Sequence, residues 1–537
     1  MRIHFTSAAS PPVRVFGSSN YHKRAQGRGA FLAAARRHPD PGSGRRRALP
    51  HIENRETVMS APDIERATGP SPDPAPPGRR HTARPLMMRL HFYAGILVAP
   101  FILIAVVTGG LYAIAPALEQ VVYRDQLHVA YTGPAKPVAE QIRAAQEVRP
   151  DLTVSAVRPA PNEGDTTRVL FTDPSLGESE RLAVFVDPST AQPVGELAVY
   201  GSSSALPMRT WISQLHRHLH LGEPGRIYSE LAASWLWVVA LGGVYLWWDR
   251  YRKARARDNG TVRLLTVDRA SKGRNRTLNW HGAVGIWIAV GLVFLSATGL
   301  TWSKYAGENV SELRTALSWT TPVLDKTIGA APAAAGGHEG HGDGHDGHAD
   351  TTVVDGNIDR IDGVLAIAAE NGASEAVEAS IPADTATAFT VAETRQPWAL
   401  AQDSVSVDGA TGRVVDVLDF STWPIAAKLT TWGIALHMGV LFGLLNQLAL
   451  LALSVALVTV IVRGYIMWWR RRPTRGSDWA VGRPPLRGAL RQARPVAAVA
   501  IVAAAVAVGW FVPLLGWTLL GFLVVDVAVG AAKRARA

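Results

Sequence analysis

The stretch "HFYAGILVAPFILIAVVTGGLYAIAP", residues 91–116, decides the fold of this chain. It contains no Asp, Glu, Lys or Arg. A helix needs about 20 predominantly apolar residues to cross the hydrocarbon core of a bilayer. We therefore predict an integral membrane protein. Further apolar runs occur at Ile227–Trp248, Trp280–Trp302, Trp432–Trp469 and Pro495–Gly530.

The charges between these runs predict an orientation. The short segments Asp249–Asn279 and Arg470–Arg494 hold ten and eight basic residues against three and one acidic residues. The long segments Glu119–Thr210 and Ser303–Thr431 hold 12 and 19 acidic residues against eight and seven basic ones. By the positive-inside rule, the short loops and both termini are cytoplasmic and the long segments lie outside. The net charge of +11 therefore indicates membrane orientation and no nucleic-acid partner.

Two compositional features narrow the classes further. The chain has no cysteine, which excludes disulfides, thiolate metal sites and cysteine nucleophiles. Residues 1–86 are rich in Arg, Pro, Ser and Gly without apolar periodicity, so we expect a disordered basic extension. No apolar stretch follows its early basic residues, so the first span is expected to act as an uncleaved signal anchor.

An internal repeat organises the rest of the chain. "RLHFYAG" (Arg89–Gly95) matches "NWHGAVG" (Asn279–Gly285) at an offset of 190, and Thr108-Gly109 matches Thr298-Gly299 at the same offset. "TWISQLH" (residues 210–216) matches "TWGIALH" (residues 431–437) at an offset of 221, which continues to "WW" at 247–248 and 468–469. The chain thus contains two copies of one unit: a span outwards, an external segment and a span inwards.

The external segments carry their own pattern. Val138–Val148 and Ile358–Glu370 have the apolar spacing of helices, and alternating strand-like runs such as "RLAVFVD" and "SVSVDG" follow them. We therefore predict two small α+β domains outside the membrane.

The repeat selects four histidines. His91 aligns with His281 and His216 with His437, whereas His218 and His220 align with Gly439 and Leu441. His91 and His281 open outward spans and should lie at the inner level, whereas His216 and His437 precede inward spans and should lie at the outer level. Ionisable residues in a membrane are costly and are candidate functional residues. Two histidine pairs stacked across a helix bundle suit two haems with two axial imidazoles each.

Two glycines accompany the inner histidines. Gly95 and Gly285 lie one helical turn after His91 and His281. They predict room for a flat macrocycle at each haem site, although small residues also serve ordinary helix packing in membranes. The chain has no "CxxCH" motif, so the cofactor expected is haem b, held without thioether bonds.

A histidine-rich run lies in the second external segment, within the interval where the two offsets diverge. "GGHEGHGDGHDGHAD" (Gly336–Asp350) alternates His338, His341, His345 and His348 with Gly, Asp and Glu. Such a run either binds Fe, Cu or Zn loosely or is a low-complexity linker.

The motifs "RLHFYAG", "LHRHLHLGEPGR", "NWHGAVG", "LHMGVLFG" and "GVYLWW" resemble the PepSY-associated transmembrane proteins, over roughly residues 85–530. That family includes iron-regulated inner-membrane proteins and haem-containing ferric-siderophore reductases. The resemblance implies two extracytoplasmic PepSY-like modules and outward electron transfer.

The expected fold is a membrane all-α helical bundle with four repeat-derived spans and a C-terminal hairpin, carrying two small α+β PepSY-like domains outside. Because Pro513 interrupts the last apolar run and the basic tail should be cytoplasmic, we predict six membrane helices. The expected extension covers residues 1–86, and the expected spans are 87–118, 211–249, 280–303 and 432–470, of which 211–249 and 432–470 each include an interfacial segment. The expected external domains are 119–210 and 304–431, the second of which contains the insertion 336–350. The expected cytoplasmic loops are 250–279 and 471–494, followed by the hairpin 495–530 and a cytoplasmic tail, 531–537.

The favoured function is a dihaem oxidoreductase of the bacterial-type inner membrane that passes electrons outwards to an external acceptor such as ferric iron or a ferric siderophore. The chain has no glycine-rich dinucleotide fingerprint, so it needs a separate cytoplasmic or quinol donor. The alternatives are a non-redox accessory for metal binding or transport, and a PepSY-type regulatory scaffold. The sequence identifies no catalytic residue.

Overall fold

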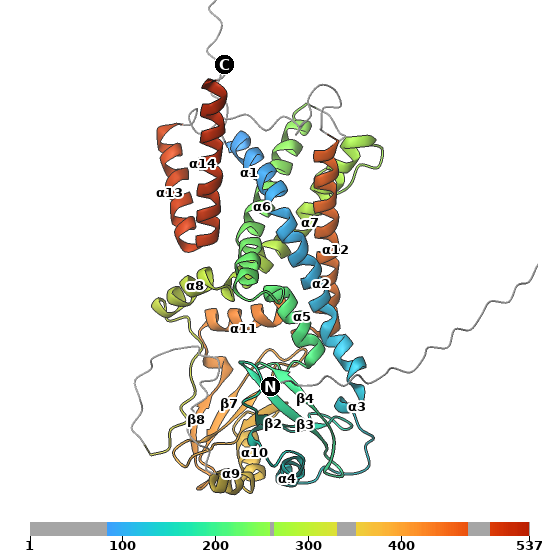
Figure 1. The fold of residues 1–537 in the computed structure, drawn as a ribbon, viewed down its shortest axis with the longest axis vertical. Coiled ribbons are helices and arrows are strands. Elements are labelled where there is room, and N and C mark those ends of the chain that lie inside the picture. Colours follow the sequence, from blue (N-terminus) through green and yellow to red (C-terminus); the bar gives the residue numbers. More distant parts are fainter. Residues whose placement is uncertain (1–82, 258–262, 330–350, 471–493, 536–537) are drawn as a thin grey trace, which may run out of the picture. The chain divides into compact units, whose positions relative to one another are not determined.

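A computed structural model describes residues 83–257, 263–329, 351–470 and 494–535, all within the compact unit Ala75–Ala537. The predicted N-terminal extension lies outside the described residues apart from its last four, and so does the histidine-rich run. The helices of the bundle and its surroundings are α1 (Ala83–Leu97), α2 (Ala99–Val122), α3 (Arg124–Leu127), α5 (Pro207–His218), α6 (Glu223–Arg255), α7 (Gly273–Thr301), α8 (Tyr305–Ala316), α11 (Ile425–His437), α12 (Gly443–Trp469), α13 (Pro495–Phe511) and α14 (Pro513–Ala535) (Figure 1).

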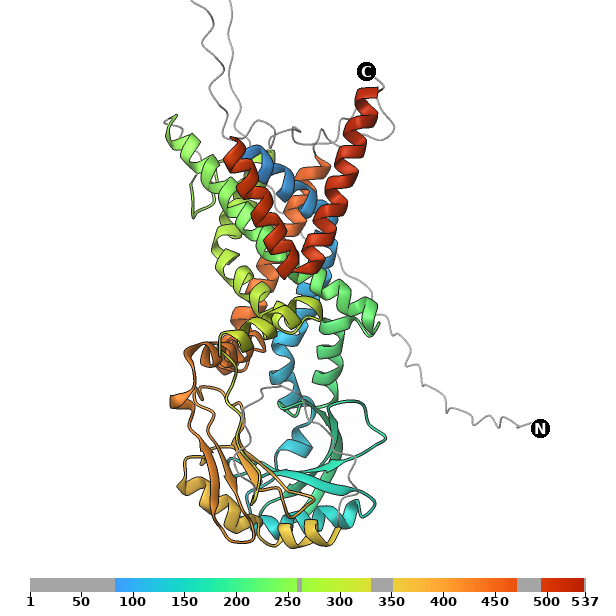
Figure 2. The same cartoon turned by 90° about the vertical axis from the view of Figure 1, so that its left-hand side faces the viewer.

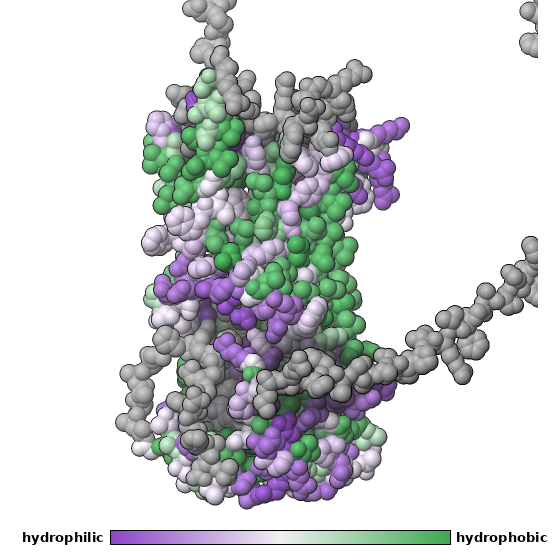
Figure 3. Space-filling model, viewed as in Figure 1, coloured by the Kyte–Doolittle hydropathy of each residue, from purple (hydrophilic) through white to green (hydrophobic). Residues whose placement is uncertain are grey.

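Five of the described helices are long and apolar enough to cross a membrane: α2, α6, α7, α12 and residues 513–532 of α14. The prediction of a multi-pass membrane protein is therefore confirmed. The remaining predicted span, the first helix of the C-terminal hairpin, corresponds to α13, an apolar helix that is shorter than the other five. Figure 3 shows the apolar surface that covers these helices, in contrast to the polar surface around α8, α11 and the sheet.

The first predicted span consists of two helices rather than one. α1 ends at Leu97 and α2 begins at Ala99, with Pro100 in its first turn. Proline has no N–H to donate and its ring disfavours a helical residue before it, so a continuous helix is interrupted here. His91 consequently lies on α1, separate from the longer and more apolar α2.

The central packing follows the repeat. α1 packs on α6 and α2 packs on α12, while α7 contacts both α6 and α12.

In the first half of α6 the buried carboxylate of Glu230 accepts hydrogen bonds from the backbone N–H groups of Tyr305 (3.0 Å) and Ala306 (2.9 Å). A carboxylate at the start of a helix satisfies free N–H donors and interacts favourably with the helix dipole. Glu230 thus fixes the start of α8 against α6.

The strands of both predicted external segments form a single sheet. The strands are β1 (Thr153–Arg158), β2 (Thr167–Thr172), β3 (Glu180–Asp187), β4 (Gln192–Tyr200), β5 (Val377–Ser380), β6 (Phe389–Glu393), β7 (Ser404–Val407) and β8 (Val414–Leu418). Their order is β4-β3-β2-β1-β5-β6-β7-β8, and all neighbours are antiparallel. The two halves join where Ala156 pairs with Ser380 and Val157 with Ala379.

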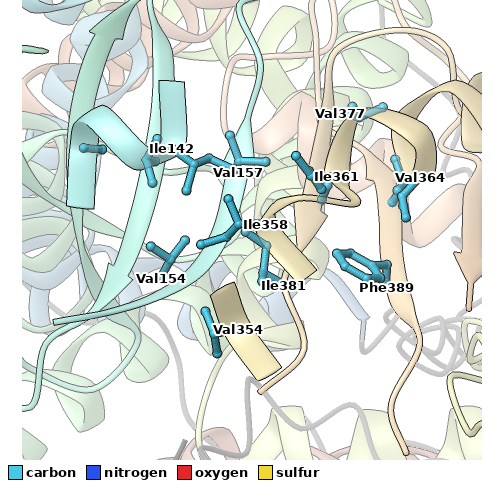
Figure 4. Close-up of a cluster of buried hydrophobic side chains, with 14 of the residues drawn as sticks. Ile142, Val154, Val157, Val354, Ile358, Ile361, Val364, Val377, Ile381 and Phe389 are labelled. Carbon is cyan, nitrogen blue, oxygen red and sulfur yellow. The ribbon is translucent and has the colours of Figure 1, made fainter. Parts of the chain in front are cut away.

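The segments predicted to form two small α+β domains therefore share one sheet, a joining that the sequence pattern did not predict. Each four-stranded half would leave β1 or β5 as an unpaired edge, which pairing of the two edges removes. The helices α4 (Val138–Val148), α9 (Thr351–Ile358) and α10 (Ile361–Glu370) accompany this sheet. One core, with side chains such as Ile142, Val157, Ile358 and Phe389, runs across the junction (Figure 4).

The C-terminal hairpin is docked on the bundle. Helical structure is interrupted at Val512, directly before Pro513, and α14 packs on α6 and α8 (Figure 2). Asp526 of α14 forms an ion pair with Arg89 of α1. Trp235 of α6 donates a hydrogen bond from Nε1 to the hydroxyl of Thr518 (2.9 Å). The hairpin therefore contacts the helix that carries His91.

Candidate cofactor site: two histidine pairs

The inner pair consists of His91 on α1 and His281 on α7. Their ring centres lie 6.2 Å apart, and the ring planes are nearly perpendicular at 80°. The repeat predicts that these two residues occupy equivalent positions, and the structure brings them together.

Backbone carbonyls fix the orientation of both inner rings. Nδ1 of His91 lies 3.0 Å from the carbonyl oxygen of Val239, and Nδ1 of His281 lies 2.9 Å from that of Val460. A carbonyl oxygen can only accept, so Nδ1 carries the proton in each ring. The lone pair of Nε2 then points away from this bond and is free to bind a metal. Val239 and Val460 are themselves at matching positions of the repeat.

The outer pair uses threonine hydroxyls in the same role. Nδ1 of His216 lies 3.0 Å from Oγ1 of Thr108, and Nδ1 of His437 lies 2.6 Å from Oγ1 of Thr298. Each hydroxyl donates its proton to the carbonyl oxygen four residues earlier in its helix, at 2.9 Å and 2.8 Å. The hydroxyl therefore accepts from Nδ1–H, which again leaves Nε2 of each histidine as the free nitrogen.

The two outer histidines are neighbours and lie far from the inner pair. His216 is close enough to His437 to affect it electrostatically, and the indole of Trp302 lies edge-on to His437 with ring centres 5.4 Å apart. Thr298 follows His281 by about 17 residues in the continuous helix α7, which at about 1.5 Å per residue separates the two levels by about 25 Å. No single ligand group spans both levels.

The end of "LHRHLHLG" leaves the helix that carries His216. α5 ends at His218, and Leu219 and His220 adopt left-handed backbone conformations with φ of 54° and 55°. His220 stacks on Trp211, with ring centres 4.9 Å apart, and its Nε2 lies 3.1 Å from the carbonyl oxygen of the same residue. The tight return into α6 requires Gly225, because a Cβ there would overlap the carbonyl group of His218.

Each of the four paired histidines packs against a glycine of a facing helix. A Cβ at Gly109 or Gly243 would lie 3.0 Å or 3.1 Å from Cε1 of His216 or His91. The equivalent atoms at Gly299 and Gly464 would lie 3.8 Å and 3.6 Å from Cε1 of His437 and His281. These four glycines let the rings approach the facing helices closely.

Gly95 and Gly285 differ from those four, because a Cβ at either position would meet no atom within 4 Å. Open space therefore lies beside each inner histidine, one turn along its helix. This is the arrangement expected if these positions leave room for a flat ligand.

The residues of the inner pair fit a shared metal centre. A metal ion binds an imidazole nitrogen at about 2 Å, so the centres of two rings on one ion lie about 6 Å apart. The observed 6.2 Å agrees with that separation. Neutral imidazoles whose second nitrogen is held by a hydrogen bond are also the usual form of a histidine ligand. The inner pair therefore fits axial ligation of a haem, and the outer pair repeats its hydrogen-bonding pattern.

A cluster of five arginines lies on or beside the sheet and at the start of α5: Arg158, Arg168, Arg181, Arg209 and Arg395. Four of them bind the loop that follows β4, through the carbonyl oxygens of Ser202 (2.7 Å), Ser203 (3.1 Å) and Ser204 (3.5 Å) and the hydroxyl of Ser202 (3.3 Å). Two carboxylates contact the cluster, those of Glu119 and Glu378.

The arginine cluster carries more positive than negative charge. Burial opposes ionisation of Glu378, yet Arg158 and Arg181 hold the pKa of its carboxyl below the usual value. Burial together with the neighbouring Arg158 lowers the pKa of Arg168 to about 10. Five guanidinium groups against two contacting carboxylates make this layer electropositive.

The cluster is also connected to His216 through α5. The buried carboxylate of Glu119 on α2 lies 2.9 Å from Nε of Arg209 and accepts a hydrogen bond from the backbone N–H of Leu206 (3.1 Å). These contacts fix the start of α5, and His216 follows Arg209 two turns later. The position of His216 thus depends on an ion pair at the junction of bundle and sheet.

The histidine-rich run, with His338, His341, His345 and His348, lies outside the described residues. Within the described part of the chain, no three His, Asp or Glu residues come together in a group able to hold a metal ion.

Residues 88–471 match the family model described as the PepSY-associated TM region. The chain belongs to the PepSY-associated transmembrane family. A comparison with curated proteins gave no match. The matched region contains all four paired histidines of this PepSY-associated protein and ends before the C-terminal hairpin.

Several residues of the site are not evident as site residues from the sequence. Thr108 and Thr298 align in the repeat, as do Gly243 and Gly464, but the alignment by itself assigns them no role. The signal that could identify them is their position: each is a threonine or glycine that occurs at equivalent positions of both repeat copies, within an apolar run. The backbone carbonyls of Val239 and Val460 leave no such trace, since any residue type supplies a carbonyl.

Proposed function

We propose that this protein carries electrons through the membrane by way of two b-type haems, from a donor on the cytoplasmic side to an external acceptor. The observation that supports this most is the arrangement of the four repeated histidines in two pairs, each ring held through Nδ1 with Nε2 free. A haem bound at such a pair supplies a one-electron Fe(III)/Fe(II) couple.

The residues of the chain have separable tasks in this proposal. His91 and His281 hold the inner haem, and His216 and His437 hold the outer one. The Val239 and Val460 carbonyls and the Thr108 and Thr298 hydroxyls keep the imidazoles in the tautomer that leaves Nε2 unprotonated. The glycines facing the rings restrict their rotation, and Gly95 and Gly285 leave space beside the inner pair.

The direction of transfer follows from charge. The loops rich in arginine and lysine favour a cytoplasmic side for the inner pair under the positive-inside rule. Arg209 of the arginine cluster lies two turns before His216 on α5, and the cluster would attract an anionic acceptor by long-range electrostatics. We therefore propose ferric iron in an anionic chelate, such as a carboxylate or catecholate siderophore, as the acceptor.

The decisive experiment is an absorption spectrum of the purified full-length protein. We expect a reducible b-type spectrum and about two haems per chain, released as free haem by acidic acetone because no thioether bond holds them. A colourless preparation from haem-replete cells would refute the proposal. Oxidation of the reduced protein by ferric citrate, followed at the haem bands, then tests the acceptor class.

A further inference from the structure

The internal repeat is broken beside the inner histidine pair. The residue before His281 is Trp280, whereas the residue before His91 is Leu90. On the facing helices, Arg463 stands where the other copy has Gly242. The two residues that differ, Trp280 and Arg463, both lie beside His281 and not beside His91. Because the hydrogen bonds of the histidines are the same in both copies, these substitutions distinguish one side of the pair from the other.

Trp280 and Arg463 contact each other. The guanidinium carbon of Arg463 lies 5.0 Å from the ring centre of Trp280, a cation–π contact. Nε of Arg463 is buried, and in the described structure no acceptor lies within hydrogen-bonding distance of it. A buried donor without an acceptor is costly, which favours a ligand that supplies one. Arg463 also lies close enough to His281 to influence it electrostatically.

Two cavities meet at Trp280. The first has a volume of about 490 Å³ and is an apolar groove along α12 and α7, lined among others by Val284, Leu451 and Val455. Val455 is 59% exposed, so the groove opens on the outer face of the bundle, which is apolar over α12 (Figure 3). The second cavity has a volume of about 670 Å³ and lies in the loop before α7, where Asp268 is among its lining residues.

We infer that Trp280 and Arg463 form a quinol-binding site that delivers electrons to the inner pair. A lipid quinol has a long apolar tail and a flat aromatic head with two oxygens. The groove suits the tail, the indole suits the head, and Nε of Arg463 suits a head-group oxygen. This inference rests on the proposed function and names its electron donor. A phospholipid also has a tail and a polar head, but its head does not stack on an indole.

The redox step balances with the two haems as oxidants. Oxidation of one quinol to the quinone breaks its two O–H bonds and releases two protons and two electrons. Two ferric haems, one held by each histidine pair, would take up these two electrons and pass them to two external ferric chelates. The two protons leave through the second cavity, which is lined by the loop before α7.

The test uses the full-length protein in nanodiscs of zwitterionic phospholipid, with decylubiquinol as the quinol. Haem reduction is followed by absorbance in Arg463→Gln and in Trp280→Leu, which restores the residue of the other copy. Trp248→Leu is the control, because Trp248 is an exposed tryptophan of α6 that lines neither cavity. We expect a loss of at least tenfold in the rate with quinol in the first two variants. Haem content and full reduction by dithionite should stay as in the unmodified protein.

Unchanged quinol rates in both variants, or no reduction of the unmodified protein by quinol, would overturn this inference while the dihaem proposal stands. A second measurement is independent of haem: labelling by a photoreactive azidoquinone, competed by decylubiquinone. Labelling of the peptide that contains Trp280, lost in Arg463→Gln, supports the site even if the protein proves to lack haem. Unchanged labelling in that variant, together with loss of a co-purifying anionic phospholipid, would assign the groove to a lipid and overturn the inference.

Discussion

The inner and outer histidine pairs perform the same local task with different means. The inner pair lies on α1 and α7, and its Nδ1 atoms donate to backbone carbonyls. The outer pair lies on the shorter helices α5 and α11, and its Nδ1 atoms donate to threonine side chains. The inner arrangement is thus a property of helix packing, whereas the outer one depends on two specific hydroxyls.

This difference has a structural origin. α5 and α11 each follow a strand of the sheet and lead back into a span, so the outer histidines are attached to the sheet as well as to the bundle. α5 and α11 have 12 and 13 residues, and a side-chain hydrogen bond to α2 or α7 restrains each of them at that junction. The inner histidines are restrained by the bundle itself.

The largest expected effect comes from removing a histidine. His281→Ala should reduce the haem content from about two to one per chain, with loss of the inner haem, and His216→Ala should do the same at the outer site. His218→Ala is the matched control and should retain both, since His218 lies two residues from His216 but is not part of a pair. Haem extraction and potentiometric titration measure this. Equal losses in the His216 and His218 variants would show that the repeat selects the wrong residue.

A threonine substitution should separate the two levels. Thr108→Val keeps the shape of the side chain and removes the hydroxyl that holds His216. Loss of the hydrogen bond that orients a ligand histidine typically costs about 10–100-fold in metal affinity. We expect weaker haem binding and a shifted midpoint potential at the outer site alone, with Thr108→Ser restoring both. An equal change at the inner site would contradict the assignment of separate levels.

Glycine substitutions should distinguish the two copies of the repeat within the inner pair. At Gly243 the added Cβ lies 3.1 Å from Cε1 of His91, but at Gly464 it lies 3.6 Å from Cε1 of His281. Crowding in a packed interior costs about 1–3 kcal/mol, and alanine gains about 1 kcal/mol over glycine in a helix. Gly243→Ala should therefore destabilise the protein by about 1 kcal/mol, whereas Gly464→Ala, with its added Cβ in ordinary contact, should stabilise it by up to about 1 kcal/mol. Thermal unfolding in detergent, with haem content as a second readout, tests this. Equal destabilisation would show that neither ring is closely packed.

The smallest effect is expected for the histidine-rich run. Deleting Gly336–Asp350 should leave both haems and the unfolding temperature unchanged, because the other copy of the repeat does without this insertion. Binding of Zn or Cu, measured by equilibrium dialysis, should fall in the deletion variant. A variant that loses haem or fails to fold would show that the run contributes to the structure.

Much of the membrane part could be predicted, because its signals are local or repeated. Apolar runs of sufficient length identify the spans, and a constant offset relates His91 to His281 without reference to three-dimensional contacts. Arg463 is recognisable as unusual within an apolar run, but its contact with Trp280 depends on how α7 and α12 pack, which no local pattern encodes.

The single sheet is the clearest failure of prediction from sequence. The sequence pattern of β1 and β5 is the same whether the two strands are edges of two domains or neighbours in one sheet. The pattern therefore does not show whether they pair. Val157 pairs with Ala379, which is far away in the chain. This pairing depends on how the edge strands β1 and β5 meet in three dimensions. In contrast, strands joined by short turns, such as β3 and β4, could be anticipated from turn residues.

The separation of the two histidine levels along α7 has an electrical consequence. A distance of about 25 Å covers most of a hydrocarbon core of about 30 Å, so an electron moving between the levels crosses most of the transmembrane voltage. One elementary charge moved across the whole potential changes the free energy by about 2.3 kcal/mol per 100 mV. In the proposed orientation, with the cytoplasm negative, the voltage drives electrons outwards. An energised cell could then reduce external acceptors that its donor alone reduces poorly, and each electron exported would draw on the charge separation that respiration maintains.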